Sequence, residues 1–396
     1  MVYNIKKILF GEVYNMKRNL LMALMQLDIG GAETHVVELA KEMSKRDYNI
    51  FVASNGGAYV KELEDAGIKH ITLPLHSKKL KDVLYSRKEL KRIIKEEKID
   101  LVHSHARIPS FILSTLKRTM DFPFVTTAHW VFKTSGGLKY LTDWGEKTVA
   151  VSEDIKKYLM DNYKTPAEDI FVTINGIDTD KFSPTLDNSS IKKELGIDDN
   201  DNVIVYISRL DEDRSLVAKH LISIVPKISE LVENLKVVIV GGGNDFENAK
   251  AMADNVNKEL SKDIITLTGP RTDINLLCSV AKLFIGVSRS ALEAMAEEKP
   301  VIIAGNEGYI GLFDEDKLGV SIDTNFCCRG CVLSTPEILL KDIATFFGMW
   351  DEDVKKIAEY GRNLILSNYS VSRMADDTQK AYDACLLQRA GKEDNK

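Results

Sequence analysis

The sequence predicts an α/β protein built from two consecutive domains, each a doubly wound parallel sheet with helices on both faces. Short β-branched runs alternate with amphipathic helical patterns almost from end to end, which is typical of parallel sheets covered by helices. The alternation pauses once, at residues 175–190, in a turn-rich segment without apolar periodicity. A chain of 396 residues is also long enough for two or three domains of roughly 150 residues each.

The first half is expected to form one domain, over residues 16–180. Its predicted strands are short apolar and β-branched runs, at residues 20–25, 49–53, 69–73, 100–103, 123–127, 147–151 and 170–174. Amphipathic patterns such as 33–44, 89–97 and 153–160 predict helices between them. Residues 1–15 precede Met16, a second start-like methionine, and are interpreted as an N-terminal extension.

The second half restarts the alternation and is expected to form another domain, over residues 181–368. Predicted strands cover 203–207, 236–240, 264–267, 283–286 and 300–303, and helices follow at 336–347, 351–367 and 371–387. The last helix is too far from any strand to be a crossover, so residues 369–396 are predicted to pack across the domains and end in a tail. Ligands bind open parallel sheets at the carboxyl ends of the strands. Residues that directly follow strands are therefore the candidates for function.

Composition and charge exclude several classes of protein. With 44% apolar and 28% charged residues the chain is neither disordered nor fibrous, and no stretch approaches the roughly 20 apolar residues of a membrane span. A net charge of −6 argues against nucleic-acid binding through overall charge. Residues up to Asp180 sum to +3 and the rest to −9, which favours two units with different surfaces. The five cysteines, an odd number, are typical of a reducing cytoplasm.

Two strand ends in the first half carry candidate binding residues. Gly30 and Gly31 stand between the first strand and a helix, where glycine allows positive φ and the helix N-terminus offers amides to an anion. An ordinary turn is the alternative. His129 follows the fifth predicted strand and is interpreted either as a donor to a sugar hydroxyl or as a satisfied structural residue. For His103 and His105 the structural interpretation is favoured.

The first strand of the second half is followed by two arginines, Arg209 and Arg214. One interpretation is a clamp on a diphosphate through bidentate, charge-assisted bonds. The other is surface pairing with the neighbouring acids Asp211, Glu212 and Asp213.

Two further strand ends in this half are rich in small residues. Residues 241–243 are three glycines, which suit close approach of a phosphate or base. They do not fit a nicotinamide dinucleotide site, because the third glycine of a GxGxxG pattern would fall at Phe246. The strand at 283–286 leads into a helix that contains Glu293. The amides of this turn could hold phosphate oxygens, and Glu293 could accept hydrogen bonds from a ribose diol; a solvated helix carboxylate is the alternative.

Two other patterns have less specific interpretations. Cys327, Cys328 and Cys331 contain a CxxC, but no second ligand pair for a structural zinc accompanies it, so a loop of reduced thiols is favoured over a metal or redox site. The stretch from Lys78 to Lys98 carries nine basic residues and could rest on anionic lipid. Because three glutamates dilute the charge, a solvated helix face is favoured.

Taken in order, these motifs resemble the family 4 retaining glycosyltransferases, whose GT-B fold has two facing Rossmann-like domains. The matching residues are Gly30-Gly31-Ala32-Glu33, Asp100 to His105, Thr127-Ala128-His129, Val151-Ser152-Glu153, Asn175-Gly176-Ile177-Asp178, Phe182, Pro184, Ser208-Arg209-Leu210, Gly241 to Gly243, Leu292-Glu293-Ala294-Met295-Ala296 and Pro300-Val301. The resemblance spans roughly residues 18–370, nearly the whole chain.

The resemblance implies transfer of a sugar, with retention, from a UDP- or GDP-sugar to a carbohydrate or lipid-linked acceptor that lies against the N-terminal domain. The implied donor-binding residues are Gly30, Gly31, Asn175, Gly243, Gly269, Arg271, Ser288, Arg289, Ser290, Ala291 and Glu293. Glu293 would bind the ribose, Arg209 and Arg214 would stabilise the leaving group, and His129 would contact the donor sugar. No metal or other cofactor is expected, since basic side chains and helix dipoles neutralise the leaving group.

Two positions depart from the family pattern. Ile285 stands where the family commonly has a second glutamate, and Ser215 stands where it has a lysine, beside Arg214. Both changes keep alternatives open: a nucleotide-sugar 2-epimerase, or a noncatalytic, glycosyltransferase-like nucleotide-binding subunit. The expected location is the cytoplasm, with peripheral contact at the inner face of the membrane if the basic stretch binds lipid. A role in cell-envelope glycan synthesis is expected, without nucleic-acid partners.

Overall fold

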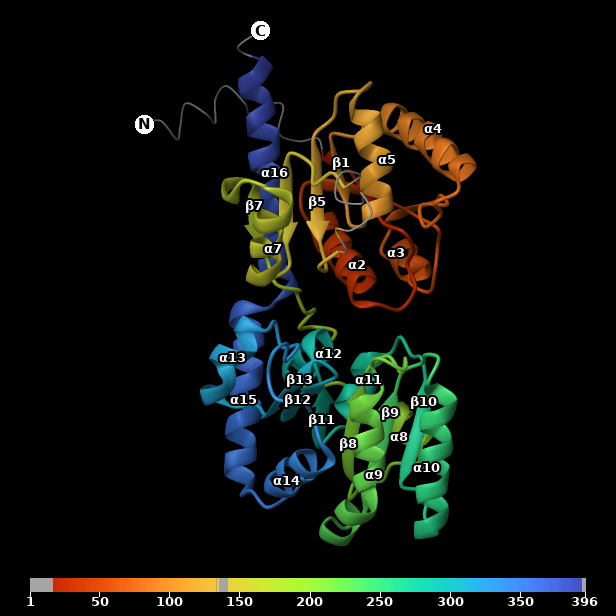
Figure 1. Ribbon diagram of the computed structural model, residues 1–396, viewed down its shortest axis with the longest axis vertical. Coiled ribbons are helices and arrows are strands. Elements are labelled where there is room, and N and C mark those ends of the chain that lie inside the picture. Colours follow the sequence, from red (N-terminus) through yellow and green to blue (C-terminus); the bar gives the residue numbers. More distant parts are fainter. Residues whose placement is uncertain (1–16, 133, 135–141, 394–396) are drawn as a thin grey trace. The chain divides into compact units, whose positions relative to one another are not determined.

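The computed structural model describes residues 17–132, 134 and 142–393 (Figure 1). The predicted N-terminal extension, residues 1–15, lies outside them. The chain divides into two compact units: unit 1 runs up to Gly176 and resumes at Ser372, and unit 2 is Ile177–Val371. Unit 2 is thus inserted into unit 1, and the C-terminal segment that the sequence predicts to span both domains is grouped with unit 1.

Unit 1 contains a seven-stranded sheet with the order β3-β2-β1-β4-β5-β6-β7, and every neighbouring pair is parallel. The strands are β1 Arg18–Ala23, β2 Tyr48–Ser54, β3 Lys69–Thr72, β4 Leu101–Ser104, β5 Phe124–Ala128, β6 Lys147–Ala150 and β7 Ile170–Val172. All seven lie within two residues of their predicted bounds. The strand order reverses between β1 and β4, which makes this the switch point where doubly wound sheets bind ligands.

The helices of unit 1 follow the strands as crossovers. They are α2 Gly31–Ser44, α3 Val60–Asp65, α4 Leu80–Glu96, α5 Arg107–Lys117 and α7 Glu153–Tyr163, with a 3₁₀ turn, η1, at Ala167–Asp169. Helices α4 and α5 bury Leu90, Ile93 and Leu113 against Leu21 and Val102 of the sheet. Helix α4 begins nine residues before the predicted start at residue 89, because its first turns are exposed and carry no apolar periodicity.

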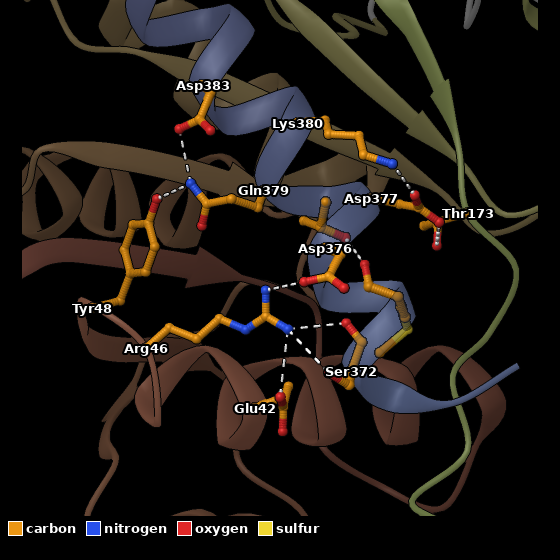
Figure 2. Close-up of polar contacts among 12 residues, drawn as sticks. Glu42, Arg46, Tyr48, Thr173, Ser372, Asp376, Asp377, Gln379, Lys380 and Asp383 are labelled. Carbon is orange, nitrogen blue, oxygen red and sulfur yellow. Dashed lines mark hydrogen bonds and ion pairs between the residues drawn. The ribbon is translucent and has the colours of Figure 1, made fainter. Parts of the chain in front are cut away.

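The last helix, α16 (Val371–Glu393), is held to unit 1 by polar contacts along its first half (Figure 2). Arg46, just after α2, pairs with Asp376 at 2.7 Å and donates to the carbonyl oxygen of Ser372 at 2.9 Å. Gln379 donates to the hydroxyl of Tyr48 in β2 at 2.9 Å. These contacts join residues more than 320 positions apart in the sequence.

Deeper in the same interface, α16 reaches the sheet itself. Successive side chains of a strand point to opposite faces, so Val102 packs with α4 and α5 while His103 points to the other face. There its Nδ1 lies 2.7 Å from the Tyr382 hydroxyl, and its Nε2 lies 2.7 Å from the Thr127 hydroxyl, with all three side chains buried. Helix α16 therefore covers the face of the sheet opposite α4 and α5.

Unit 2 contains a six-stranded sheet with the order β10-β9-β8-β11-β12-β13. The strands are β8 Asn202–Ile207, β9 Leu235–Val240, β10 Ile265–Gly269, β11 Leu283–Gly286, β12 Val301–Gly305 and β13 Gly308–Leu312. Strand β13 pairs antiparallel with β12 and is the strand that the sequence pattern missed, because its run contains two glycines instead of β-branched residues. The order reverses between β8 and β11.

Helices cover both faces of the second sheet. They are α8 Ser189–Leu195, α9 Leu216–Leu231, α10 Phe246–Leu260, α11 Ile274–Ser279, α12 Ser288–Ala296, η2 Glu315–Lys317, α13 Leu318–Asp323, α14 Pro336–Phe347 and α15 Asp351–Asn368. Ile204 and Ile285 of the sheet pack with α9, α10 and α14 in one apolar core. Among the described residues, no helix is both long enough and apolar enough to cross a bilayer.

Candidate functional site

In unit 2, the predicted donor-binding residues gather at the carboxyl ends of the strands next to the switch point. Arg209 follows β8, Gly243 follows β9, Gly269 ends β10, and Ser288 follows β11. Neighbouring parallel strands end at the same edge of a sheet, so loops far apart in the sequence lie beside one another. This edge is the candidate nucleotide site of unit 2.

The three-glycine turn is built to let two loops approach each other. Gly241 has φ +142°, and a Cβ there would lie 1.8 Å from the carbonyl oxygen of Ser208. A Cβ on Gly243 would lie 2.3 Å from the carbonyl group of Leu210. The Leu210 amide donates to the Gly242 carbonyl oxygen at 2.9 Å. The glycines therefore pack the β9 loop against the loop that carries Arg209.

Both arginines of the β8 loop are exposed. Arg209 pairs with Asp211 at 2.8 Å, and 61% of its side chain remains accessible. The backbone amide of Arg214 donates to the Asp211 carbonyl oxygen at 2.8 Å, which fixes the turn. Of the two interpretations of these arginines, the structure shows surface pairing for Arg209 and leaves the guanidinium accessible to an anion.

The turn between β11 and α12 is closely packed. Ser288 has φ +51°, in the left-handed region, and its amide donates to the Phe326 carbonyl oxygen at 2.7 Å. The Ser288 amide is thus already bonded within the protein, contrary to its expected role toward phosphate. The next amides, from Arg289 to Ala291, belong to the first turn of α12, where a helix leaves its N–H groups without intrahelical acceptors.

A buried ion pair occupies the first two turns of α12. Nε of Arg289 donates to Oε1 of Glu293 at 2.7 Å, and both side chains are more than nine-tenths buried. A buried carboxylate is stable when it is paired and hydrogen-bonded. Glu293 is therefore a fixed acceptor on the helix and differs from the solvated carboxylate that was the alternative interpretation.

Arg271, expected near the base, is already paired on two sides. It makes two bonds to the Asp273 carboxylate, at 2.8 and 2.6 Å, and two to the Glu194 carboxylate, at 2.5 and 3.2 Å. These hydrogen bonds raise the pKa of Arg271 and lower that of Asp273. Gly269 has φ +74° and so turns the chain toward this arginine.

The two departures from the family pattern have distinct structural consequences. Ile285 is fully buried in β11, so no polar side chain can reach the site from this position. Ser215 begins the loop-to-helix transition before α9, and its hydroxyl donates to the buried carboxylate of Asp245. Lys219, one turn into α9, pairs with the same carboxylate at 2.5 Å and lowers its pKa to about 2.

In unit 1, the glycines after β1 do not use the left-handed region. Gly30 is extended, with φ −177°, and Gly31 is not among the residues with positive φ, so neither position uses the positive φ that glycine allows. A Cβ on Gly31, however, would meet nothing within 4 Å. The first residue of α2 therefore leaves open space at the helix N-terminus instead of a strained turn.

Three histidines come together at the switch point of unit 1. His35 lies on α2, and His105 and His129 directly follow β4 and β5. Nδ1 of His105 lies 3.2 Å from Nε2 of His129, and one ring nitrogen from each of the three lies within 4.8 Å of the others. Oδ1 of Asn175 lies 3.0 Å from Nδ1 of His35. The sequence analysis did not identify His35, and it favoured a structural role for His105. The available signal for His35 was its place in the first turns of the helix that follows Gly30 and Gly31.

Burial keeps the imidazoles of His105 and His129 neutral. It lowers the pKa of His105 and His129 well below the usual value, and that of His103 to about 3. The neighbouring histidines add to the effect, because a second positive charge would be repelled. At neutral pH His129 therefore offers a lone pair or a single N–H, and no net charge, to a ligand.

The CxxC segment lies in the loop between α13 and α14. Its three cysteines form no disulfide, and Cys328 is buried with its Sγ 3.6 Å from the Ile303 carbonyl oxygen. Burial raises the pKa of Cys328 to about 12, which disfavours the thiolate form that zinc and redox chemistry need. Reduced thiols in a loop remain the interpretation of these cysteines.

Two family models match the chain. The Glycosyltransferase Family 4 model matches residues 29–181, and the Glycosyl transferases group 1 model matches residues 187–326. Together they account for most of both units.

Similar proteins include enzymes and solved structures of the same type. A UDP-Gal:alpha-D-GlcNAc-diphosphoundecaprenol alpha-1,3-galactosyltransferase of Escherichia coli is 24% identical over 326 residues, 74% of this chain and 77% of the relative. The crystal structure of a glycosyltransferase from Rickettsia africae has a TM-score of 0.74 at 24% identity and covers 94% of this chain and 99% of its own. That of Anabaena HepE in complex with UDP and glucose has a TM-score of 0.71 at 16% identity and covers 93% and 100%.

Proposed function

Since the chain belongs to the family 4 glycosyltransferases and has the GT-B fold, we propose that it transfers a sugar, with retention of configuration, from a nucleotide-diphosphate-sugar to a carbohydrate or lipid-linked acceptor. One observation carries the proposal most directly: the fixed carboxylate of Glu293, the accessible guanidinium of Arg209 and the first amides of α12 all lie at the strand ends beside the β8/β11 switch point. The carboxylate can accept hydrogen bonds from ribose hydroxyls, and the guanidinium and amides can bind the diphosphate of a nucleotide-sugar.

We infer that the donor is held by unit 2. Glu293, oriented by Arg289, accepts hydrogen bonds from the ribose hydroxyls, while Arg209, Arg214 and the amides of α12 bind the diphosphate. Gly243 keeps the backbone accessible to the phosphates, and the loop from Gly269 to Arg271 lies near the base. UDP and GDP are the proposed nucleotides, and the relatives named for UDP-galactose and for a UDP complex support UDP.

We propose that catalysis rests on the leaving group. Positive side chains and helix amides stabilise the diphosphate as its bond to the sugar breaks, and the acceptor attacks from the face that the diphosphate leaves. His129, neutral at pH 7, is the proposed contact for the donor sugar, and Gly30, Gly31 and Asn175 are further proposed donor-binding residues. The transfer itself requires no metal ion in this scheme, because Arg209 and Arg214 supply the positive charge.

The experiment is an assay of nucleotide diphosphate release over a panel of UDP- and GDP-sugars, with an acceptor panel. We expect Glu293→Ala and Arg209→Ala each to lower kcat/KM at least 100-fold, the size expected for lost transition-state contacts. Glu352→Ala, at an exposed acid in the first turn of α15, is the matched control and should retain activity. Unchanged turnover in both site variants would remove these residues from the mechanism.

The same assay separates the two alternatives. A changed sugar formed from the donor without any acceptor would favour the 2-epimerase. Nucleotide binding by calorimetry without turnover of any donor would favour the noncatalytic subunit, which the apolar Ile285 makes worth testing.

We also propose a peripheral contact between α4 and anionic lipid at the inner face of the membrane, as a lipid-linked acceptor would require. The first half of α4 exposes Leu80 and Leu84, with 73% and 58% of their surfaces accessible, and beside them the exposed cations Lys81 and Lys88. Positions 80, 84 and 88 lie on one face of a helix. Apolar side chains flanked by lysines fit the boundary of a bilayer that carries negative headgroups.

Vesicle flotation tests the lipid contact. Vesicles with one third phosphatidylglycerol should capture the protein and neutral phosphatidylcholine vesicles should not. The double variant Leu84→Ser, Lys88→Glu should lose capture, whereas Lys355→Glu, on α15, should keep it. Equal capture of all three proteins would contradict a role for α4.

A further inference from the structure

The three histidines of unit 1 share the features of a built site. Strands β1, β4 and β5 are neighbours in the parallel sheet, so their carboxyl ends meet at one edge. His105 and His129 are the residues directly after β4 and β5, and His35 is on α2, which follows β1. Rigid strands and a helix therefore hold all three side chains, which gives a binding site its precision.

The distances between the imidazoles match those of ligands on one metal ion. Nδ1 of His105 and Nε2 of His129 lie 3.2 Å apart. Two nitrogens bound to a tetrahedral zinc at 2.0–2.1 Å lie roughly 3.3 Å apart. His35 completes the group, with one ring nitrogen from each residue within 4.8 Å of the others.

The tautomer of His105 follows from the same geometry. Nδ1 is the nitrogen that faces His129, so Nδ1 coordinates the ion and the ring proton is on Nε2. His105 is only 4% exposed, and this Nε2 has no hydrogen-bond partner among the residues that the structure describes.

The surroundings of the site also fit an ion. Oδ1 of Asn175 lies 3.0 Å from Nδ1 of His35, so it can accept that N–H and fix the orientation of the ring. Histidines that bind metals almost always donate their other ring nitrogen to such an oxygen. The ring of His103 lies 3.9 Å from that of His105 and is held by its own hydrogen bonds.

We propose that His35, His105 and His129 bind a divalent transition-metal ion such as Zn²⁺, leaving a fourth coordination position open. The ligand set is three imidazoles with no carboxylate, which favours zinc, cobalt, nickel or copper over magnesium and calcium. Because His129 is also the side chain proposed to contact the donor sugar, a bound ion inhibits the transfer. This last consequence, but not the binding itself, rests on the proposed function.

The binding test uses the full chain, without a histidine tag, after removal of metal by chelation and dialysis. We expect one Zn²⁺ per chain by elemental analysis, and a tetrahedral visible spectrum on titration with Co²⁺ that Zn²⁺ abolishes. His35→Gln, His105→Gln and His129→Gln should each weaken Zn²⁺ binding at least tenfold. His70→Gln and His220→Gln, at histidines outside the cluster, are the matched controls and should bind as the unchanged chain does.

Folding is checked by the melting temperature of each metal-free variant. If the buried His105→Gln fails to fold, His129→Ala serves in its place, because that side chain is only partly buried. Binding by all three cluster variants with unchanged affinity, or the absence of stoichiometric binding, would overturn the site.

The activity arm is separate. Zn²⁺ should inhibit turnover of the unchanged chain in parallel with occupancy of the site, and a chelator should restore it. Activation by Zn²⁺ would overturn the competition for His129. A chain that binds zinc through the three histidines but transfers no sugar even in its metal-free form would sustain the site and refute the proposed function, so the two failures are distinguishable.

Discussion

At the scale of single residues, two acids on one helix show how a buried carboxyl group is accommodated. Glu293 has Arg289 at 2.7 Å, so its charge is neutralised in place. Glu297, one turn later, is 1% exposed, and neither of its carboxyl oxygens has a hydrogen-bond partner within the part of the chain that the structure describes. Burial raises the pKa of Glu297 to about 9, and the positive charge of Lys299 offsets this only in part.

Glu297 is predicted to make the free energy of unfolding depend on pH between 4.5 and about 9. Its carboxyl group stays protonated in the folded chain up to about pH 9, whereas in the unfolded chain the carboxyl has an ordinary pKa of 4.5. The free energy of unfolding should therefore fall as pH rises between these values, by about 1.4 kcal/mol per pH unit from this group. Glu297→Gln should remove that slope.

Urea unfolding of unit 2 between pH 5 and 8 checks this. The stability of the Gln variant relative to the unchanged chain should grow steadily with pH, while Glu298→Gln, at the neighbouring residue, should show no such trend. A constant difference across the range would mean that the carboxyl is ionised in the folded state.

At the scale of elements, the glycine turn after β9 acts as a spacer between two loops. Gly243→Ala would place a Cβ 2.3 Å from the Leu210 carbonyl group, so the β9 and β8 loops must separate. We expect a loss of about 1–3 kcal/mol in stability, as for overpacked sites, and at least a tenfold fall in kcat/KM because Arg209 moves with its loop.

The control for this loop is Gly319→Ala in α13, where a Cβ would meet nothing within 4 Å. It should be neutral or slightly stabilising, since alanine is the better helix former. Wild-type kinetics in the Gly243 variant would contradict the spacer role.

Helix α16 supports a second prediction at this scale. Tyr382→Phe keeps the ring but removes the hydroxyl that lies 2.7 Å from Nδ1 of buried His103. Losing this partner should cost about 1–3 kcal/mol of stability. Tyr85→Phe, at an exposed tyrosine of α4, is the comparison and should stay within about 0.5 kcal/mol. Equal unfolding midpoints of the two variants in urea would show that the contact contributes nothing.

The sequence sufficed for most elements but not for the partners of the functional side chains. The strands of both sheets follow from apolar runs, and β13 was missed because Gly308 and Gly311 interrupt its pattern. The strand-end position of Arg209 could be predicted, but its pairing with Asp211 could not be separated from phosphate binding. The contact of His103 with Tyr382 joins residues 279 positions apart in the sequence. A local sequence pattern cannot predict a contact between such distant residues.

At the scale of the whole molecule, the two units differ in their titratable groups. The buried histidines whose pKa burial lowers most, including His103 at about 3, are in unit 1. Unfolded histidine binds a proton below pH 6.5, whereas these folded ones do not. The free energy of unfolding of unit 1 should therefore fall as pH drops from 6.5 toward 5, by about 2 kcal/mol at pH 5 for each histidine that stays neutral.

Tryptophan fluorescence can follow unit 1 alone. Of the three tryptophans, Trp350 is in unit 2 and exposed, while Trp130 and Trp144 are in unit 1. In a Trp350→Phe protein the urea midpoint should fall between pH 7 and pH 5. The variants His105→Gln and His129→Gln should each reduce the fall, and a midpoint independent of pH would contradict the neutral state of these two histidines.

The order of the chain also bears on its synthesis. Unit 1 consists of the residues up to Gly176 and the segment from Ser372 onward. All of unit 2 lies between these two parts in the sequence. During synthesis, all of unit 2 is therefore made before α16. Until α16 is made, the face of the unit 1 sheet around Tyr48 and His103 stays uncovered. Nascent chains that stall or terminate near residue 371 should bind chaperones through that face, although most of the polypeptide has already been made.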